Sequence, residues 1–236
     1  MSRSDPRPYA RPAKGTQPAY DFPDYRSTAK RHPKRRLTRI EHTLSEVTGP
    51  GFAGGWAGGN NVDLTRQHKG EPLGERIIVA GRVLDEDGRP VPGTLVELWQ
   101  ANAAGRYRHE VDQHNAPIDP NFTGAGQTVT DKDGAWRFLT ITPGHYPWRN
   151  GRNAWRAAHL HFGVFGPAFA TRLVTQMYFP GDYLLAQDPL YNAVPDPQAR
   201  ERLIATYDGD LSEEEFALGF RWDIVLRGRA ATPMER

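Results

Sequence analysis

The sequence predicts an all-β protein, an antiparallel β-sandwich with an irregular, Pro-rich N-terminal arm and few short helices. Glycine and proline are abundant, with 24 and 20 among the 236 residues, and they interrupt the chain at short intervals. The apolar segments between them are short and alternate with polar residues, as expected of strands with one buried face. Many short strands separated by Gly and Pro turns are typical of two packed antiparallel sheets.

Strands are expected from residue 76 onward, where the irregular sequence ends. The segment RIIVAGRVLD is followed by the turn-forming EDGRPVPG and then by TLVELWQA, which alternates again. A second hairpin is expected where the turn DKDG separates GQTVT from AWRFLTI. The remaining strands are predicted in AHLHFGVFG and ATRLVTQMYFPGD, which form a third pair, and in FRWDIVLRG, which closes the set.

Only two segments have a helical pattern. Residues 195–208 place Leu203 and Ile204 on one helical face. Residues 212–218 open with Ser212 and Glu215, which have the spacing of a capping box. We therefore expect one helix in each segment.

We expect two regions along the chain: an arm and irregular subunit-contact region at residues 1–75, and the β-sandwich domain at 76–236. The first 40 residues carry eleven Lys and Arg, three Asp and six Pro. Such a positive charge is compatible with nucleic-acid binding, but no helix-turn-helix, zinc-finger or RNP motif accompanies it. An arm that wraps a partner subunit is therefore favoured, and no nucleic-acid partner is expected.

Composition excludes several classes of protein. The chain has no cysteine, which excludes disulfides, iron–sulfur clusters and thiolate metal sites. No segment approaches the roughly 18 consecutive apolar residues of a membrane span. The N-terminal segment MSRSDPRPYARPAKG lacks the apolar core of a secretory signal. We expect a cytoplasmic protein without a membrane partner.

The segment NAWRAAHLHFG places His159 and His161 on the same face of an expected strand. Taken alone, such a pair is more often structural than metal-binding. No Glu follows at the spacing that cupins require, and no nearby carboxylate completes a 2-His-1-carboxylate iron site. A metal at this position would need other oxygen ligands.

Tyrosine is the remaining candidate ligand. Tyr107 lies in NAAGRYRHE and Tyr146 in TPGHYPWRNG, both turn-rich segments. A phenol with a pKa of about 10 is a poor ligand at neutral pH, but a trivalent cation favours the phenolate. Two phenolates and two imidazoles suit Fe(III). Taken singly, each tyrosine is more simply interpreted as an aromatic that packs in its loop.

Several segments, in this order, resemble the intradiol ring-cleavage dioxygenases. The blocks GRYRH, YPWRNG and WRAAHLHF are the most specific. A weaker match, PDYRSTAKRHP, extends the resemblance into the arm, so that it spans nearly the whole chain. Within the family, the chain resembles the iron-binding β subunits of the members that act on protocatechuate. The other matching segments are GERIIVAGRVLDEDGRPVPGTLVELWQANA, PIDPNF, TDKDGAWRFLTITPGH, TRLVTQMYFPGD and FRWDIVLRG.

The resemblance implies that one non-haem Fe(III) is bound by Tyr107, Tyr146, His159 and His161. Water or hydroxide would take a fifth position. Tyr146 is also implied in catalysis, as the phenolate that leaves the metal and takes one of the two protons of a catechol. No ligand position departs from the family's pattern.

The resemblance also implies roles for residues that bind no metal. Arg156 would be catalytic, stabilising charge that develops on the substrate ring; from the sequence alone it would be interpreted as an ion-pairing surface residue. Trp99 would pack beside the ligands. The residues implied in substrate binding are Tyr25, Trp148, Arg156 and Gln176.

The implied reaction is the cleavage of protocatechuate with O₂ to 3-carboxy-cis,cis-muconate, in the degradation of aromatic compounds through the β-ketoadipate pathway. The implied partner is a homologous α subunit in a hetero-oligomer. Catechol and hydroxyquinol are alternative substrates, although their dioxygenases carry a helical N-terminal region where this chain is Pro-rich. A binding sandwich without catalysis, as in the family's own α subunit, is a further alternative; the four ligands argue against it.

Overall fold

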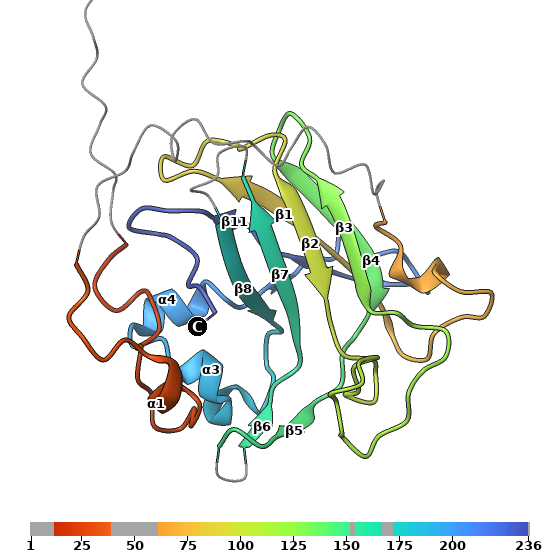
Figure 1. Ribbon diagram of the computed structural model, residues 1–236. Helices are drawn as coiled ribbons and strands as arrows, with labels where there is room; N and C mark the ends of the chain where they lie inside the picture. The colour runs from red at the N-terminus through yellow and green to blue at the C-terminus, as the bar shows by residue number, and fades with distance from the viewer. Residues whose placement is uncertain (1–11, 39–60, 152–153, 167–171, 236) are drawn as a thin grey trace, which may run out of the picture.

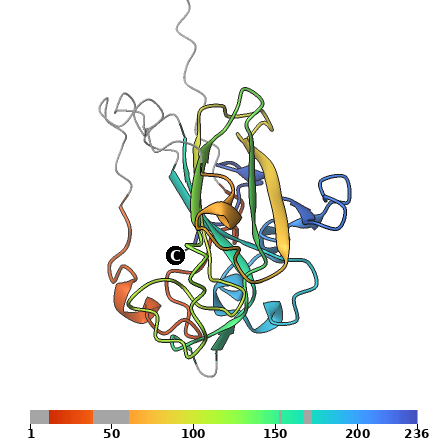
Figure 2. The same ribbon diagram turned by 90° about the vertical axis from the view of Figure 1, so that its right-hand side faces the viewer.

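The computed structural model describes residues 12–38, 61–151, 154–166 and 172–235. Its strands form two sheets that stack face to face, seen from the side in Figure 2. One sheet has the order β11 (Ile224–Val225), β1 (Arg76–Leu84), β10 (Leu218–Arg221), β9 (Thr206–Tyr207), with β4 (Ala135–Ile141) also paired to β1. The other has the order β3 (Ala125–Val129), β2 (Leu95–Trp99), β7 (His159–Phe165), β8 (Arg172–Tyr178). The predicted fold class is confirmed.

The remaining elements of the described residues are short. A separate pair of strands is formed by β5 (Tyr146–Trp148) and β6 (Ala154–Arg156). Figure 1 shows α1, α3 and α4 gathered at one side, next to the C-terminus. The helices are α1 (Thr28–Arg31), α3 (Pro189–Asn192) and α4 (Pro197–Glu201), with 3₁₀ turns η2 (Leu64–Arg66) and η3 (Leu185–Gln187).

The main core fills the space between the two sheets. It includes Val79 and Phe138 from the first sheet and Leu98 and Phe162 from the second, all of them almost completely buried. Their positions follow the alternation of side chains along each strand. Burial of this apolar surface is the main term that holds the sheets together, at about 25 cal/mol per Å².

The predicted hairpins around the Asp-Gly turns are wrong in their pairing. The turn at 131–134 forms locally, since Gly134 donates its N–H to the carbonyl of Asp131. However, β3 pairs with β2, whereas β4 pairs with β1 in the opposite sheet. The connection between β1 and β2 crosses between the sheets in the same way. Turn residues specify a chain reversal, but burial decides which partner each strand joins.

The final strand is split and runs parallel to its neighbour. Both β10 and β11 pair with β1 in parallel, so that the sheet is mixed rather than purely antiparallel. The break falls at Trp222 and Asp223, where the Asp223 carboxylate accepts the N–H of Arg82 at 2.8 Å. Gly81 permits this crossing, because a Cβ there would lie 1.7 Å from the Trp222 carbonyl oxygen.

The helix predictions are only partly confirmed. Within 195–208 the helix covers Pro197–Glu201 and the chain then enters β9. The helix expected at 212–218 is wrong, because Glu215 has a φ of 55° and the segment is a turn. Ser212 accepts the N–H of Gly219 across this turn instead of capping a helix. Helices α1 and α3 were not predicted, since four residues are too few for a periodic pattern.

The described part of the arm, residues 12–38, packs on its own chain. The N–H of Ala19 donates to the carbonyl of Ala193, and the N–H of Arg26 donates to that of Asn150. Thr16 is fully buried. Contact of the arm with a partner chain stays a prediction. In the described ranges no helix has the length and apolarity needed to cross a membrane.

Candidate metal centre

Four side chains converge at the end of the second sheet. The Nε2 atoms of His159 and His161 are 3.2 Å apart. The phenol oxygen of Tyr146 lies 3.3 Å from Nε2 of His159, and that of Tyr107 lies 3.0 Å from Nε2 of His161. All four ligands predicted from the sequence are thus brought together. We call the histidines the strand side of this cluster and the tyrosines its loop side.

The strand side is positioned by β7. His159 and His161 are two residues apart on this strand, so their side chains share a face. Because β7 is hydrogen-bonded to β2 and β8, its backbone is fixed along both edges. Trp99 on β2 stacks on the ring of His161 with a centroid distance of 4.9 Å and an interplanar angle of 7°. Both imidazoles are therefore held in defined orientations.

Each histidine is also fixed through its second ring nitrogen. Nδ1 of His159 lies 2.6 Å from the carbonyl oxygen of Ala157, and Nδ1 of His161 lies 3.1 Å from Oε2 of Glu235. Burial raises the pKa of Glu235, but the hydrogen bond and charge of His161, together with Gln176 and Arg156, lower it by more, so that the net pKa is lowered. Both acceptors therefore require a proton on Nδ1, and the Nε2 lone pairs both face the cluster.

The loop side is positioned by turns rather than by a sheet. Asp112 accepts the N–H of Tyr107 at 2.7 Å, and the Asn102 side chain accepts the N–H of Arg106 at 2.9 Å. The loop that carries Tyr107 touches the segment before Tyr146 at Gly105. A Cβ at Gly105, whose φ is 75°, would lie 2.1 Å from the carbonyl oxygen of His145. Only glycine permits this approach of the two tyrosine segments.

The cluster fits a metal of high positive charge. Burial, with Arg156 and His161 nearby, holds the pKa of His159 well below its usual value, so this imidazole is neutral. Burial raises the pKa of Tyr107 well above its usual value and also raises that of Tyr146, which Arg156 opposes. Without a metal, each phenol therefore keeps a proton directed at an imidazole lone pair. A cation that replaces both protons would satisfy two phenolates and two imidazoles together.

Carboxylates do not supply an alternative metal site. In the part of the chain that the structure describes, no group of three or more His, Cys, Asp or Glu side chains is placed to hold a metal. Among the described residues, the two phenol oxygens lie next to the imidazole nitrogens of the strand side. Phenolate oxygens are the hard ligands that ferric iron prefers.

Arg156 lies next to the cluster and is only 2% exposed. Its Nη1 donates to the phenol oxygen of Tyr146 at 3.3 Å, and its Nε donates to Asp188 at 2.8 Å. Its Nη2 donates to Gln176 and to Tyr178. Asp188 keeps Arg156 charged and, at the same time, accepts the N–H groups of Leu190 and Tyr191 as the N-cap of α3. The guanidinium is consequently a fixed cation behind Tyr146.

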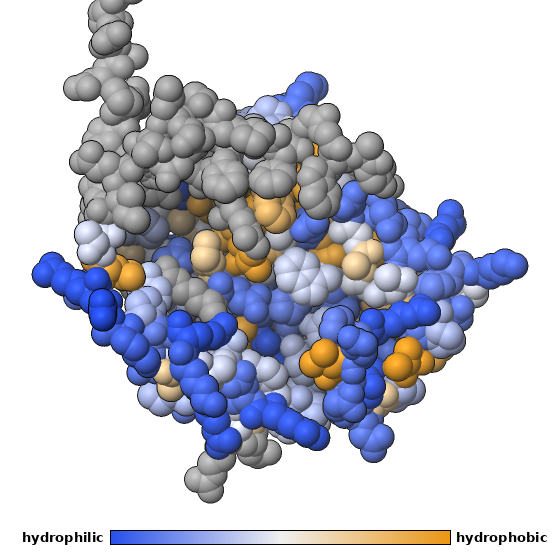
Figure 3. All heavy atoms as spheres, viewed as in Figure 1, coloured by the Kyte–Doolittle hydropathy of each residue, from blue (hydrophilic) through white to orange (hydrophobic). Residues whose placement is uncertain are grey.

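A large pocket opens in front of the cluster. Its volume is about 970 Å³, and its walls include Trp99, Tyr107, Tyr146, Trp148 and His161. Figure 3 shows one face of the molecule, hollowed near its centre, with hydrophobic residues along the upper side of the hollow and mainly hydrophilic ones below it. The size is sufficient for a single aromatic ring with its substituents.

The predicted substrate-binding residues fall into two groups. Tyr25 packs edge-on against Trp148, with a centroid distance of 4.6 Å, and Trp148 lines the large pocket. Gln176 instead lies behind the cluster, where it lines a separate cavity of about 20 Å³. Its Nε2 is buried and has no hydrogen-bond partner in the structure. Arg156 is likewise behind the cluster, and it contacts two pocket-lining side chains: it donates to the phenol oxygen of Tyr146, and its guanidinium lies 5.4 Å from the ring centroid of Trp148.

Sequence analysis missed three residues that hold this site. Asp188 precedes a proline at a helix start, so its capping role was detectable, but its ion pair with Arg156 was not. Asp112 lies in a turn-forming segment without any sign of its bond to Tyr107. Glu235 is 74 residues from His161 and lies outside all the matching segments. The contacts of Asp188 with Arg156 and of Glu235 with His161 join segments 32 and 74 residues apart, which local patterns do not contain.

Comparisons with known proteins agree with this site. A family model described as "Dioxygenase" matches residues 47–228, and one described as "Protocatechuate 3,4-dioxygenase beta subunit N terminal" matches residues 9–43. The chain is 57% identical over 223 residues to the protocatechuate 3,4-dioxygenase beta chain of Burkholderia cepacia, with 94% of each chain covered. It is 31% identical over 202 residues to the protocatechuate 3,4-dioxygenase alpha chain of Pseudomonas putida, covering 82% of this chain and 95% of that one.

Solved structures show the same fold. Catechol 1,2-dioxygenase from Pseudomonas arvilla C-1 matches with a TM-score of 0.53 and 26% identity, covering 71% of this chain and 56% of that chain. The family match, the relatives and the converging ligands agree with the resemblance found in the sequence motifs. The chain therefore belongs to the intradiol ring-cleavage dioxygenases, a family of non-haem iron enzymes.

Proposed function

We propose that this chain is an Fe(III) dioxygenase that cleaves protocatechuate with O₂ to 3-carboxy-cis,cis-muconate, a step of the β-ketoadipate pathway of aromatic degradation. The observation that carries the proposal is the convergence of two phenol oxygens and two imidazole nitrogens in front of a pocket. The name of the relative from Burkholderia cepacia supports the choice of substrate. The reaction breaks the bond between the two hydroxyl-bearing carbons and adds both oxygen atoms to the product.

Tyr107, Tyr146, His159 and His161 would hold the iron. Bound there, ferric iron supplies Lewis-acid activation of a catecholate toward O₂. Two phenolates offset much of its positive charge, which lowers the cost of burying it. The orientation of both imidazoles by Ala157 and Glu235 places the lone pairs for this role before any metal arrives.

Tyr146 and Arg156 would handle the substrate's charge and protons. A phenolate at Tyr146 would accept a proton from a catechol hydroxyl. Burial raises the pKa of this phenol above its ordinary value, so the phenolate, once it is not bound to the metal, takes up a proton readily. Arg156, 3.3 Å from the same oxygen, stabilises the negative charge that remains on the ring. Its ion pair with Asp188 keeps it in place during this exchange.

Trp148 and Tyr25 would form a wall against the substrate ring, and Gln176 would act by orienting Arg156 from behind. Arg149 also lines the pocket and supplies a cation for the carboxylate that distinguishes protocatechuate from catechol. We further propose that residues 76–236 form the catalytic domain and that residues 1–75 serve as arm and subunit-contact region.

The partner in this proposal is a homologous α chain, with which this chain would form a hetero-oligomer. The similarity to both the beta and the alpha chain of protocatechuate 3,4-dioxygenases supports such a pair. The four ligands present here are the reason to assign catalysis to this chain.

The test is to express the chain with and without a cognate α chain and to measure iron content, visible absorption and products. We expect one iron per chain, a reddish colour from phenolate-to-iron charge transfer, and 3-carboxy-cis,cis-muconate from protocatechuate. Catechol and hydroxyquinol serve as competing substrates. A colourless protein without iron would overturn the metal assignment, and faster turnover of catechol than of protocatechuate would overturn the substrate.

A further inference from the structure

We propose that the C-terminal tail, residues 231–235, is a built part of the metal centre, and that Glu235 is the positioning residue that orients His161 toward the metal. The inference rests on the proposed function, since it concerns the same site. None of the sequence motifs includes this tail, and it reaches the site from a distant part of the chain.

The distance between Glu235 and His161 indicates that the Glu235 carboxylate orients the His161 imidazole. Oε2 of Glu235 lies 3.1 Å from Nδ1 of His161, and their side chains are 25% and 11% exposed. An ionised carboxylate only accepts hydrogen bonds, so the proton must be on Nδ1 and the lone pair on Nε2. That lone pair faces His159 and Tyr107. Glu235 thus selects the tautomer that a metal needs.

The two histidines are oriented in different ways. His159 is held by the carbonyl of Ala157, two residues before it on the same segment. Among the described residues, the acceptor for Nδ1 of His161 is Glu235, 74 residues away. A carboxylate also makes the imidazole more basic, and therefore a stronger ligand, than a carbonyl does. Loss of the tail would consequently affect His161 without touching His159.

Residues 233–235 are each held by a hydrogen bond to another part of the chain. The N–H of Glu235 donates to the carbonyl of Val174 at 2.7 Å, and Thr175 donates its hydroxyl to the carbonyl of Pro233 at 2.7 Å. The N–H of Met234 donates to the side chain of Gln17 in the arm at 2.9 Å. The tail therefore lies against β8, the strand next to the ligand strand.

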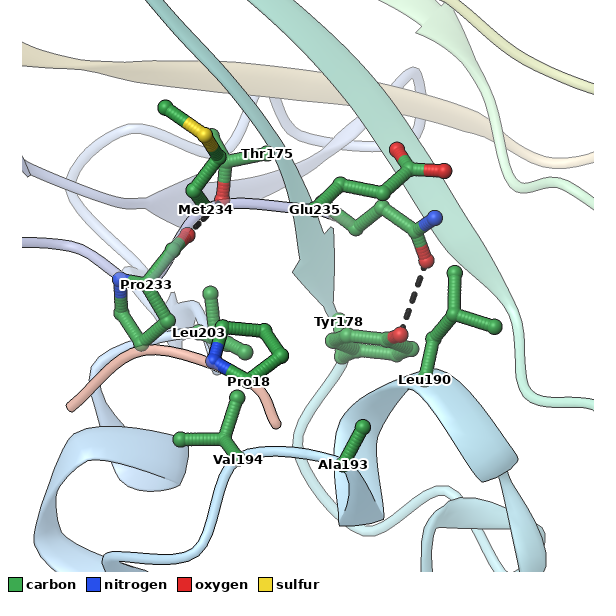
Figure 4. A pocket seen from close by; sticks show the side chains of 11 residues that line it. Pro18, Thr175, Tyr178, Leu190, Ala193, Val194, Leu203, Pro233, Met234 and Glu235 are labelled. Carbon is green, nitrogen blue, oxygen red and sulfur yellow. Dashed lines mark hydrogen bonds between the residues drawn. The ribbon is translucent and has the colours of Figure 1, made fainter. Parts of the chain in front are cut away.

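Figure 4 shows the tail beside β8, with Pro18 of the arm facing Pro233 across a cavity of about 20 Å³. Glu235 and Gln176 both line this cavity, and Oε1 of Gln176 accepts the hydroxyl of Tyr178 at 2.8 Å. Arm, tail and β8 therefore close the site from behind. This packing holds Glu235 in a defined position.

The experiment compares Glu235→Ala, Glu235→Gln and wild type, using iron as the probe. Iron affinity is measured by competition with a chelator, and the charge-transfer band is recorded. We expect Glu235→Ala to lose about 10–100-fold in iron affinity and to shift the band. Glu235→Gln should recover part of the loss, because its amide oxygen can accept from Nδ1.

Glu213→Ala is the matched control, since Glu213 forms a half-exposed ion pair with Arg137. It should leave affinity and band unchanged. Iron affinity within about twofold of wild type and an unshifted band in Glu235→Ala would overturn the role of the tail while leaving the proposed function intact. Failure of the wild-type protein to bind iron would overturn the proposed function and this inference together. Thermal unfolding of the metal-free variants separates a local effect from loss of the fold. If Glu235→Ala is unfolded, the test uses Glu235→Gln instead. The inference is then overturned if Glu235→Gln has wild-type iron affinity and a wild-type band while NMR shows no proton on Nδ1 of His161.

Discussion

The strand side and the loop side of the metal centre are built by different physical means. His159 and His161 lie on a seven-residue strand that is hydrogen-bonded on both edges and buried along nearly its whole length. Tyr107 lies in a loop, and Tyr146 begins a three-residue strand paired only with β6. The loop side depends on single side-chain bonds and on one close backbone contact at Gly105.

Because of this difference, the loop side of the site can move without loss of the fold, whereas the strand side cannot. Strand geometry is shared with the core, so the histidines cannot move unless the sheet does. Loops open at lower free energy than core strands. The ligand that must leave the metal in the proposed reaction, Tyr146, is on the loop side, where movement costs less.

The largest effect is expected from removing a ligand on either side. His161→Ala and Tyr107→Phe each delete one donor atom from the cluster while keeping the packed surroundings. We expect both to lose iron or the charge-transfer band, and activity with it. Iron analysis and visible spectroscopy are the measurements, and full iron content with the wild-type spectrum in both variants would refute the ligand assignment.

Arg156→Ala should separate catalysis from metal binding. Arg156 contacts Tyr146 but is not a ligand, so iron and colour should be retained. Turnover should fall by about 10²–10³, the usual effect of removing one preorganised group from a catalytic site. Arg137→Ala, which alters an exposed arginine paired with Glu213, is the control. Near-normal turnover in Arg156→Ala would reduce this residue to a structural one.

Gly105→Ala should disturb the loop side alone. Its Cβ would collide with the carbonyl of His145, and its φ of 75° is strained for alanine. Gly88→Ala is a matched control, because Gly88 has a φ of 77° and no atom within 4 Å of the added Cβ. Both should lose about 1–2 kcal/mol of unfolding free energy from backbone strain, and Gly105→Ala should lose more, because its Cβ also collides with the His145 carbonyl. Only Gly105→Ala should also change the charge-transfer spectrum; identical spectra would show that the contact does not position the tyrosines.

A smaller effect is expected in the pH dependence of the metal-free protein. Burial raises the pKa of Tyr107 in the folded chain above its value of about 10 in the unfolded chain. The folded state therefore holds the proton more tightly, and this contribution to stability is present below pH 10 and lost as the pH rises further. Tyr107→Phe should show a shallower decline above about pH 10 in denaturant unfolding. Equal slopes in both proteins would contradict the raised pKa.

Much of the strand side follows from local pattern. The alternation in AHLHFGVFG places two imidazoles on one face whatever the partners of the strand are, and the segments around residues 76, 95 and 135 are strands as predicted. Pairing could not be deduced in the same way. The Asp-Gly turn before Ala135 favours a hairpin, yet its two strands belong to opposite sheets because each buries its apolar face against different neighbours.

The fold class, the family and the four candidate ligands could be inferred from the amino-acid sequence, because they are encoded in short segments with characteristic spacing. How the candidate ligands are held became visible only in the folded chain. Asp188 binds Arg156, Asp112 binds Tyr107 and Glu235 binds His161. The last of these pairs spans 74 residues, a separation at which nothing in the local pattern marks one partner for the other. Such pairs form when burial of the core brings distant segments together, and hydrogen bonding then satisfies the polar groups that are enclosed.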